Sequence, residues 1–172
     1  PPGQGGMERQ AFLQAIELSK YMDVSIFSSS TDGNLFSGTP IQFYNTKPYF
    51  GRLAKEINAL RIFGSMLLNG VFFKRDVLYL HQFNFLTFLT LLLCLLTRRR
   101  AFIKIANSGK NFDLKLFFNR LYPLKLFKKT FDSPLFTFLC LNTRNKDDFS
   151  KFGMKNVHLV PLTWSEEVTI LK

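Results

Sequence analysis

His81 is the side chain of this sequence best suited to proton transfer. It directly follows the apolar run DVLYL of residues 76–80. A neutral imidazole both donates and accepts hydrogen bonds, so His81 is able to carry a proton or to hold a sugar hydroxyl. Spacing alone favours the plainer alternative, which is a hydrogen-bonded histidine at the end of a strand. The other histidine, His158, lies within the apolar run of residues 157–160 and is interpreted as structural.

A polar turn after a second apolar run is the next candidate ligand-binding site. Asn107, Ser108 and Gly109 follow the run FIKIA at residues 102–106. An amide and a hydroxyl in this position are able to hydrogen-bond a ligand. The same three residues are also an ordinary way to end a strand.

A glycine cluster, GQGG at residues 3–6, precedes the first helical pattern and is the third candidate. Glycines let the backbone approach a ligand, and the following helix offers unpaired N–H groups for a phosphate. The cluster is not a dinucleotide-binding fingerprint, because the third glycine of that motif would fall on Glu8, and it has no Gly-Lys-Ser/Thr of a P-loop. A helix start with flexible glycines is the equally simple alternative.

Alternating segments predict an α/β fold with a Rossmann-like parallel sheet and helices on both faces. Strands are expected at residues 24–27, 40–44, 76–80, 102–106, 135–141 and 157–160. Helices are expected at residues 7–21, 51–68, 85–96, 112–129 with an interruption at Pro123, and 146–152. In open parallel sheets, ligands bind at the carboxyl ends of the strands. By this rule, the places expected to bind a ligand are the glycine cluster, His81 and the turn at residues 107–109.

Composition places the chain among globular proteins. Of its 172 residues 47% are hydrophobic, which suffices for a core and excludes disordered and collagen-like classes of protein.

Cys94 and Cys140 lie in apolar runs without zinc-ligand spacing, and we expect both to be reduced core residues of a cytosolic protein. The apolar run of residues 85–96 is shorter than the roughly 20 residues of a membrane-spanning helix and predicts a buried helix. The chain opens without signal-peptide features or an initiator methionine, so we expect its beginning to lie upstream.

The formal net charge of +11 indicates an anionic partner. Nucleic acid is disfavoured because the Lys and Arg residues are scattered, with only short runs at residues 98–100 and 128–129. An acceptor linked to a lipid at the inner membrane face fits the charge better, since each Lys or Arg near an anionic surface contributes about 1 kcal/mol. Residues 112–129 mix Phe and Leu with Lys and Arg, as interfacial helices do, although an amphipathic core helix is slightly favoured.

Three segments, in this order, resemble the N-terminal domain of the family 4 glycosyltransferases. They are GGMERQ at residues 5–10, DVLYLH at residues 76–81 and FIKIANSG at residues 102–109. Residues 136–142 and 152–161 look like the later strand of that domain and its approach to the interdomain hinge. The likeness extends over roughly residues 3–161.

This resemblance implies a retaining glycosyltransferase of the GT-B type, with two Rossmann-like domains. Residues 1–161 would be the acceptor-side domain, and residues 162–172 a tail atypical of the family. The nucleotide-sugar donor would be a co-substrate held mainly by the second domain, which is not in this sequence, and neither a metal nor another cofactor is implied. We therefore expect a chain that binds a sugar or lipid-linked acceptor in surface polysaccharide, lipopolysaccharide or glycolipid synthesis, inactive without its donor domain.

The resemblance also implies roles for individual residues. His81 and Asn107 would be catalytic. The implied substrate-binding residues are Gly5, Gly6, Glu8, His81, Asn107, Ser108 and Gly109. Glu8 has an equally good alternative role, because a carboxylate near a helix N-terminus stabilises the helix. Retaining transfer requires an acceptor hydroxyl near the anomeric carbon, a stabilised leaving diphosphate and exclusion of water, of which this chain would supply the first and part of the last.

The sequence departs from the family pattern in three places. No strand precedes the glycine cluster, Asn107 stands where many relatives carry histidine, and LTW at residues 162–164 replaces Asn-Gly. A non-enzymatic alternative therefore stays open, namely a basic Rossmann-like module that associates with a membrane surface or an anionic partner. Only the enzyme hypothesis requires His81, Asn107 and the glycine cluster at one edge of the sheet.

Overall fold

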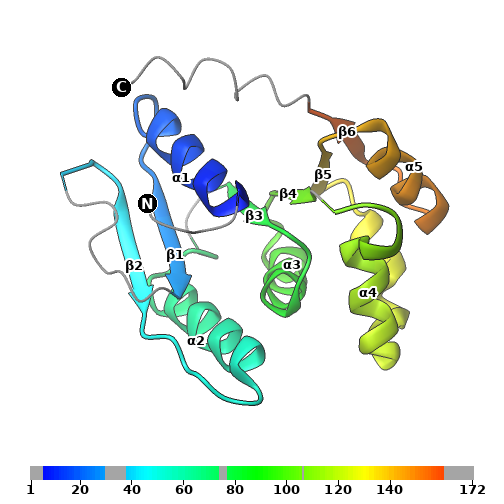
Figure 1. Cartoon of the computed structure of the whole chain (residues 1–172). Helices are drawn as coiled ribbons and strands as arrows, with labels where there is room; N and C mark the ends of the chain where they lie inside the picture. The colour runs from blue at the N-terminus through cyan, green and yellow to red at the C-terminus, as the bar shows by residue number, and fades with distance from the viewer. Residues whose placement is uncertain (1–5, 30–37, 74–76, 106, 161–172) are drawn as a thin grey trace. The chain divides into compact units, whose positions relative to one another are not determined.

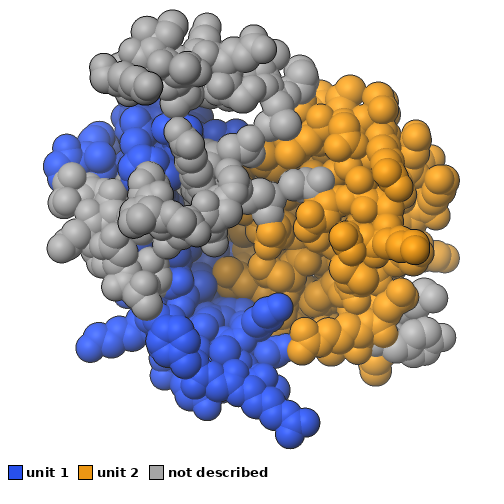
Figure 2. Space-filling view, in the orientation of Figure 1, with its two compact units in different colours: residues 1–74 blue, residues 75–172 orange. Residues whose placement is uncertain are grey.

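The computed structural model describes residues 6–29, 38–73, 77–105 and 107–160. The chain forms two compact units, Pro1–Lys74 and Arg75–Lys172, which are coloured blue and orange in Figure 2. Each unit contains its own parallel sheet and its own helices.

The first unit combines a two-stranded parallel sheet with helices before and after it (Figure 1). Its described elements are α1 (Gly6–Leu18), β1 (Ser25–Ser29), β2 (Gln42–Thr46) and α2 (Ala54–Leu68). The register pairs Ser25 with Gln42 and Ser29 with Thr46. One apolar cluster joins α1 to the sheet and consists of Ala15, Ile41, Phe12, Ile16, Val24, Ile26 and Phe43.

The second unit is a four-stranded parallel sheet in the order β3-β4-β5-β6. Its strands are β3 (Leu78–His81), β4 (Ala101–Ile105), β5 (Phe136–Cys140) and β6 (Val157–Leu159). Its helices are α3 (Phe85–Thr97), η1 (Gly109–Asn111), α4 (Asp113–Arg120), η2 (Tyr122–Asp132) and α5 (Thr143–Phe152). Each connection between neighbouring strands is helical, as parallel pairing requires. All carboxyl ends of the strands therefore lie at one edge of this sheet.

Phenylalanines fill one face of the four-stranded sheet. The fully buried residues on that face of β4 and β5 are Ala101, Ile103, Ile105, Phe136, Phe138 and Cys140. Rings from the loop after β3 and from α3, α4, η2 and β5 form the phenylalanine cluster of Phe83, Phe88, Phe117, Phe118, Phe131 and Phe136. Ring pairs of this kind add to the hydrophobic stabilisation that burial gives.

The predicted α/β class with parallel strands is confirmed, and the element bounds agree closely with the expected ones. The sequence predicts one sheet, however, whereas the described strands form two. Local periodicity identifies strands but does not determine which strands pair. The predicted buried helix at residues 85–96 is α3, whose end is capped by Arg98 in a left-handed conformation.

The segment at residues 112–129 is a core element. It forms α4 and most of η2, and Leu114, Phe117 and Phe118 are buried. The core-helix alternative therefore describes this segment better than an interfacial helix. Cys94 and Cys140 are buried and unbridged, as expected. Among the described residues, no helix has the length and apolarity needed to cross a bilayer.

Candidate functional site

The carboxyl edge of the second unit gathers most of the residues that the sequence selects. His81 is the last residue of β3 and pairs in register with Lys104 of β4. The turn at residues 107–109 follows the end of β4, and α5 begins directly after β5. Strand order thus brings two of the three predicted places, His81 and the turn at residues 107–109, to neighbouring positions at one edge, together with the start of α5, which was not predicted.

His81 is held neutral by its surroundings. Its ring packs edge-on against Tyr79, with the ring centroids 5.0 Å apart, and its Nδ1 atom is buried without a hydrogen-bond partner. Burial is the main cause that lowers the pKa of His81 to about 4, and the positive charge of Lys104 is the second cause. A neutral imidazole can both accept and donate a hydrogen bond, which suits contact with a hydroxyl.

Lys104 is a charged residue that the sequence analysis did not single out. It lies within the apolar run of β4 and is only 4% exposed. Burial lowers the pKa of its ammonium group. In the sequence, a lysine within the apolar run FIKIA suggests a solvent-exposed position on an edge strand. Only the pairing of Lys104 with His81 in the parallel sheet shows that this lysine belongs to the candidate site.

Asp113 joins the loops that follow β3 and β4. The Nδ2 group of Asn107 donates to Asp113 Oδ1 at 2.8 Å, while Asp113 Oδ2 is buried without a partner. Burial raises the pKa of this carboxyl, and hydrogen bonds from Asn107 and from the backbone of Phe83 act in the opposite direction. Asp113 thus contacts Asn107 and the backbone of the loop that follows His81. Its role could not be predicted from its position at the start of a helix.

Asn145 anchors the start of α5 to the end of β4. Its side chain is 0% exposed, and its Nδ2 group donates to the carbonyl oxygens of Ile105 at 3.1 Å and of Asn107 at 3.4 Å. Its Oδ1 atom is buried without a partner. Asn142 caps the same helix by accepting the backbone N–H of Asn145 at 2.9 Å. The two asparagines at three-residue spacing after a strand are the sequence signal that could have identified this residue.

Gly109 has a structural role in this turn. Its backbone is left-handed, with a φ of +64°, and an added Cβ would lie 2.9 Å from the guanidinium of Arg144. Its N–H donates to Asp148 Oδ2 at 2.6 Å. The predicted contact between Gly109 and substrate therefore cannot use this N–H while the bond to Asp148 exists. Ser108, directly before it, is partly buried.

The glycine cluster belongs to the first unit. Gly5 lies outside the described residues, and Gly6 and Glu8 are in the first turn of α1. The expectation that the glycine cluster shares one sheet edge with His81 and Asn107 is therefore wrong, because α1 belongs to the unit that has its own two-stranded sheet. The second unit alone carries His81, Asn107, Ser108 and Gly109, at and after the carboxyl ends of β3 and β4. The predicted tail at residues 162–172 also lies outside the described residues.

Some buried polar atoms of the second unit have no hydrogen-bond partner. Among its described residues they are His81 Nδ1, Thr90 Oγ1, Asp113 Oδ2 and Asn145 Oδ1. Within the described residues, no group of three or more His, Cys, Asp or Glu is placed to hold a metal ion.

Comparisons with family models, with curated proteins and with solved structures gave no match. Membership of the family 4 glycosyltransferases thus stays a prediction from the three segments that resemble it. The chain is established as an α/β protein with parallel strands.

Proposed function

We propose that this chain is the acceptor-binding domain of a retaining glycosyltransferase. The observation that carries the proposal is the position of His81, Asn107 and Asp113 at the carboxyl ends of β3 and β4, where Asn107 Nδ2 donates to Asp113 Oδ1 at 2.8 Å. The hydroxyls of a sugar or a lipid-linked sugar would hydrogen-bond the exposed Asn107 side chain and the half-buried His81 ring. The nucleotide-sugar would be held mainly by a donor domain on another part of the protein or on a partner chain.

In this proposal each residue has a limited task. His81, neutral at pH 7 because of its lowered pKa, holds an acceptor hydroxyl and takes part in moving its proton. Asp113 is a positioning residue, because its Oδ1 atom accepts from the Asn107 amide and fixes the orientation of that side chain. Asn145 is a positioning residue, because it holds the end of β4 and the following turn. The chain alone would orient the acceptor but would not stabilise the leaving diphosphate.

Sugar binding by the full chain tests this function directly. We expect methyl glycosides of glucose, galactose or N-acetylglucosamine to bind, as detected by saturation-transfer NMR, and to shift the backbone amide signals of residues 81–83 and 107–113. Asp113→Asn should weaken binding about tenfold, because a hydrogen bond to a charged group is lost. The matched control is Asp147→Asn, which makes the same change at an exposed position of α5.

Two outcomes would contradict the proposal. One is the absence of binding by all three glycosides, and the other is equal weakening by Asp113→Asn and Asp147→Asn. Circular dichroism of both variants would show whether each retains the native secondary structure.

A second candidate is a binding module for an anionic membrane surface, and one feature of α2 favours it. Leu53, Leu60 and Leu67 recur every seven residues and are all exposed, and Leu68 beside them is 90% exposed. Seven-residue spacing places such side chains on one side of a helix. On a chain of net charge +11, an exposed leucine stripe suits peripheral attachment at the cytoplasmic membrane face.

Vesicle sedimentation tests this second candidate. The chain should sediment with vesicles that contain phosphatidylglycerol and stay in solution with pure phosphatidylcholine. Leu60→Gln should reduce the bound fraction several-fold, since burying a leucine contributes about 1.5–3 kcal/mol. The exposed Leu96→Gln on α3 serves as the control, and equal effects of the two changes would count against attachment through α2.

A further inference from the structure

A short loop that presents an exposed phenylalanine joins β2 to α2 in the first unit (Figure 1). It comprises residues 47–52, with the sequence KPYFGR, and is named the aromatic loop. Phe50 in this loop is 78% exposed, and Tyr49 beside it and Leu53 directly after the loop are also exposed. Single exposed apolar side chains are common on proteins, but three of them within five residues form a local apolar surface.

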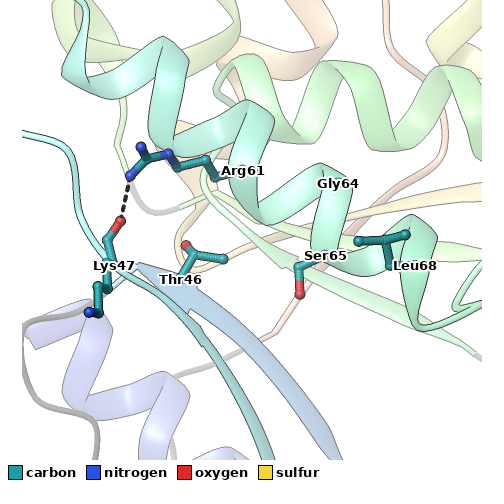
Figure 3. Close-up of a pocket in the computed structure, with 6 residues that line it drawn as sticks. All are labelled: Thr46, Lys47, Arg61, Gly64, Ser65 and Leu68. Atoms are coloured by element: carbon teal, nitrogen blue, oxygen red, sulfur yellow. Dashed lines mark hydrogen bonds between the residues drawn. The ribbon is translucent and has the colours of Figure 1, made fainter.

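Hydrogen bonds from α2 fix the backbone of the aromatic loop. Asn58 binds Tyr49 at two points, since its Oδ1 atom accepts from the Tyr49 N–H at 2.7 Å and its Nδ2 group donates to the Tyr49 carbonyl at 3.2 Å. Arg61 donates from Nη1 to the Lys47 carbonyl at 3.0 Å, as the dashed line in Figure 3 shows. The loop is therefore ordered in advance, and a partner would bind it without the entropy cost of ordering a flexible segment.

Tyr49 and Phe50 differ in how the first unit holds them. An added Cβ at Gly51 would lie 2.7 Å from Tyr49 Oη, so the tyrosine ring lies directly against this glycine. The guanidinium carbon of Arg61 lies 5.9 Å from the centroid of the same ring. Phe50, in contrast, is largely exposed to water. A phenylalanine fixed in this position gives up the stabilisation of burial, which a partner that covers the ring would restore.

Positive charge surrounds the aromatic loop. Lys47, Arg52 and Lys55 are all exposed, and no Asp or Glu occurs within residues 47–55. Anionic lipid headgroups attract Lys and Arg side chains, and aromatic side chains insert at the boundary between the headgroups and the acyl chains. An exposed aromatic ring with only basic charges beside it therefore matches the surface of an anionic membrane.

We infer that the aromatic loop inserts Phe50 into an anionic membrane surface, with Lys47, Arg52 and Lys55 at the lipid headgroups. The inference rests on the membrane partner of the second candidate function, but it assigns the insertion to this loop rather than to Leu60 and the other leucines of α2. It uses only the first unit and does not depend on sugar binding at the carboxyl edge of the second unit.

Tryptophan fluorescence measures this insertion directly. Phe50→Trp in a Trp164→Phe background gives the full chain a single tryptophan. With vesicles of phosphatidylglycerol and phosphatidylcholine in equal parts, we expect its emission to shift to shorter wavelength and brominated lipids to quench it. The matched control is Phe73→Trp in the same background, because Phe73 is 74% exposed and follows the other end of α2. The emission of this control should change little.

Sedimentation with the same vesicles measures how much the loop contributes to binding. Phe50→Ser should weaken binding about tenfold because the inserted side chain is lost, whereas Phe50→Leu keeps an apolar group and should retain most of the binding. Phe73→Ser should bind like the wild type. Lys47→Gln should weaken binding about fivefold, since one charge near the headgroups is lost. Lys155→Gln removes the same charge from an exposed position of the second unit and should have a smaller effect.

The outcomes separate this inference from the other proposals. Equal quenching of Phe50→Trp and Phe73→Trp, or wild-type binding by a folded Phe50→Ser variant, would overturn it. If Leu60→Gln weakens binding in that case, attachment through α2 stands alone. A loss of binding in Phe50→Ser with no effect of Leu60→Gln would support the aromatic loop and count against α2. Absence of wild-type binding to anionic vesicles would overturn both membrane proposals and leave the sugar-binding proposal unaffected.

Discussion

Replacing Phe131 with alanine is expected to lower the free energy of unfolding of the second unit by about 3–5 kcal/mol. The side chain is 0% exposed. Its ring centroid lies 5.8 Å from Phe83, 5.6 Å from Phe88 and 6.3 Å from Phe136, so it links a loop, a helix and the sheet. Removing it leaves a cavity among rings that cannot all move to fill it. Domains of this size are stable by only about 5–15 kcal/mol, so the loss would be a large fraction of the stability.

Hydrogen exchange at the amides of β4 and β5, measured over a series of urea concentrations, gives this loss for the second unit alone. The control is Leu96→Ala on α3, where the side chain is 81% exposed and the expected change is within about 0.5 kcal/mol. A loss below about 1 kcal/mol for Phe131→Ala would show that η2 does not pack on the sheet. The site would be affected as well, because the Phe83 backbone contacts Asp113.

The local elements of this fold follow from the sequence to a large extent. The run FLTFLTLLLCLL predicts a helix at residues 85–96, and α3 spans Phe85–Thr97 because Asn84 caps it by accepting from the Thr87 N–H. Pro123 interrupts the following helical segment as expected, since α4 ends at Arg120. The division of the strands into two sheets could not be predicted, because strand pairing depends on contacts between distant residues.

The sequence predicted the place of His81 and Asn107, but neither the place of the glycine cluster nor the hydrogen bonds within the site. The rule for parallel sheets correctly locates His81 and Asn107 at one edge, since it depends only on strand direction. The hydrogen bonds of Asn145 to Ile105 and Asn107 join residues about 40 positions apart, and no local pattern encodes them. Lys104 shows the same limit, because its burial results from neighbouring strands rather than from its own segment.

Acidification is expected to destabilise the second unit between pH 6.5 and about 4 through His81. In the unfolded chain this histidine has the ordinary pKa of 6.5, whereas in the folded protein burial and Lys104 lower the pKa to about 4. Within this window the unfolded state binds the additional proton, so stability falls as the pH falls and levels off below pH 4. At about 1.4 kcal/mol per pH unit, the full effect is about 3 kcal/mol.

Unfolding curves of the wild type and of His81→Gln, measured from pH 7 to pH 4, isolate this contribution. The variant should lose about 3 kcal/mol less than the wild type across the window. Burial raises the pKa of Asp113, which favours the folded state on acidification, but both proteins share this opposite effect and it cancels in the difference. His158→Gln, at an exposed position of β6, is the matched control and should behave like the wild type.

Parallel curves for wild type and His81→Gln would mean that the folded protein takes up the proton on His81 as readily as the unfolded chain does. Since a protonated imidazole cannot accept a hydrogen bond, that result would also remove the physical basis for His81 as the group that holds an acceptor hydroxyl.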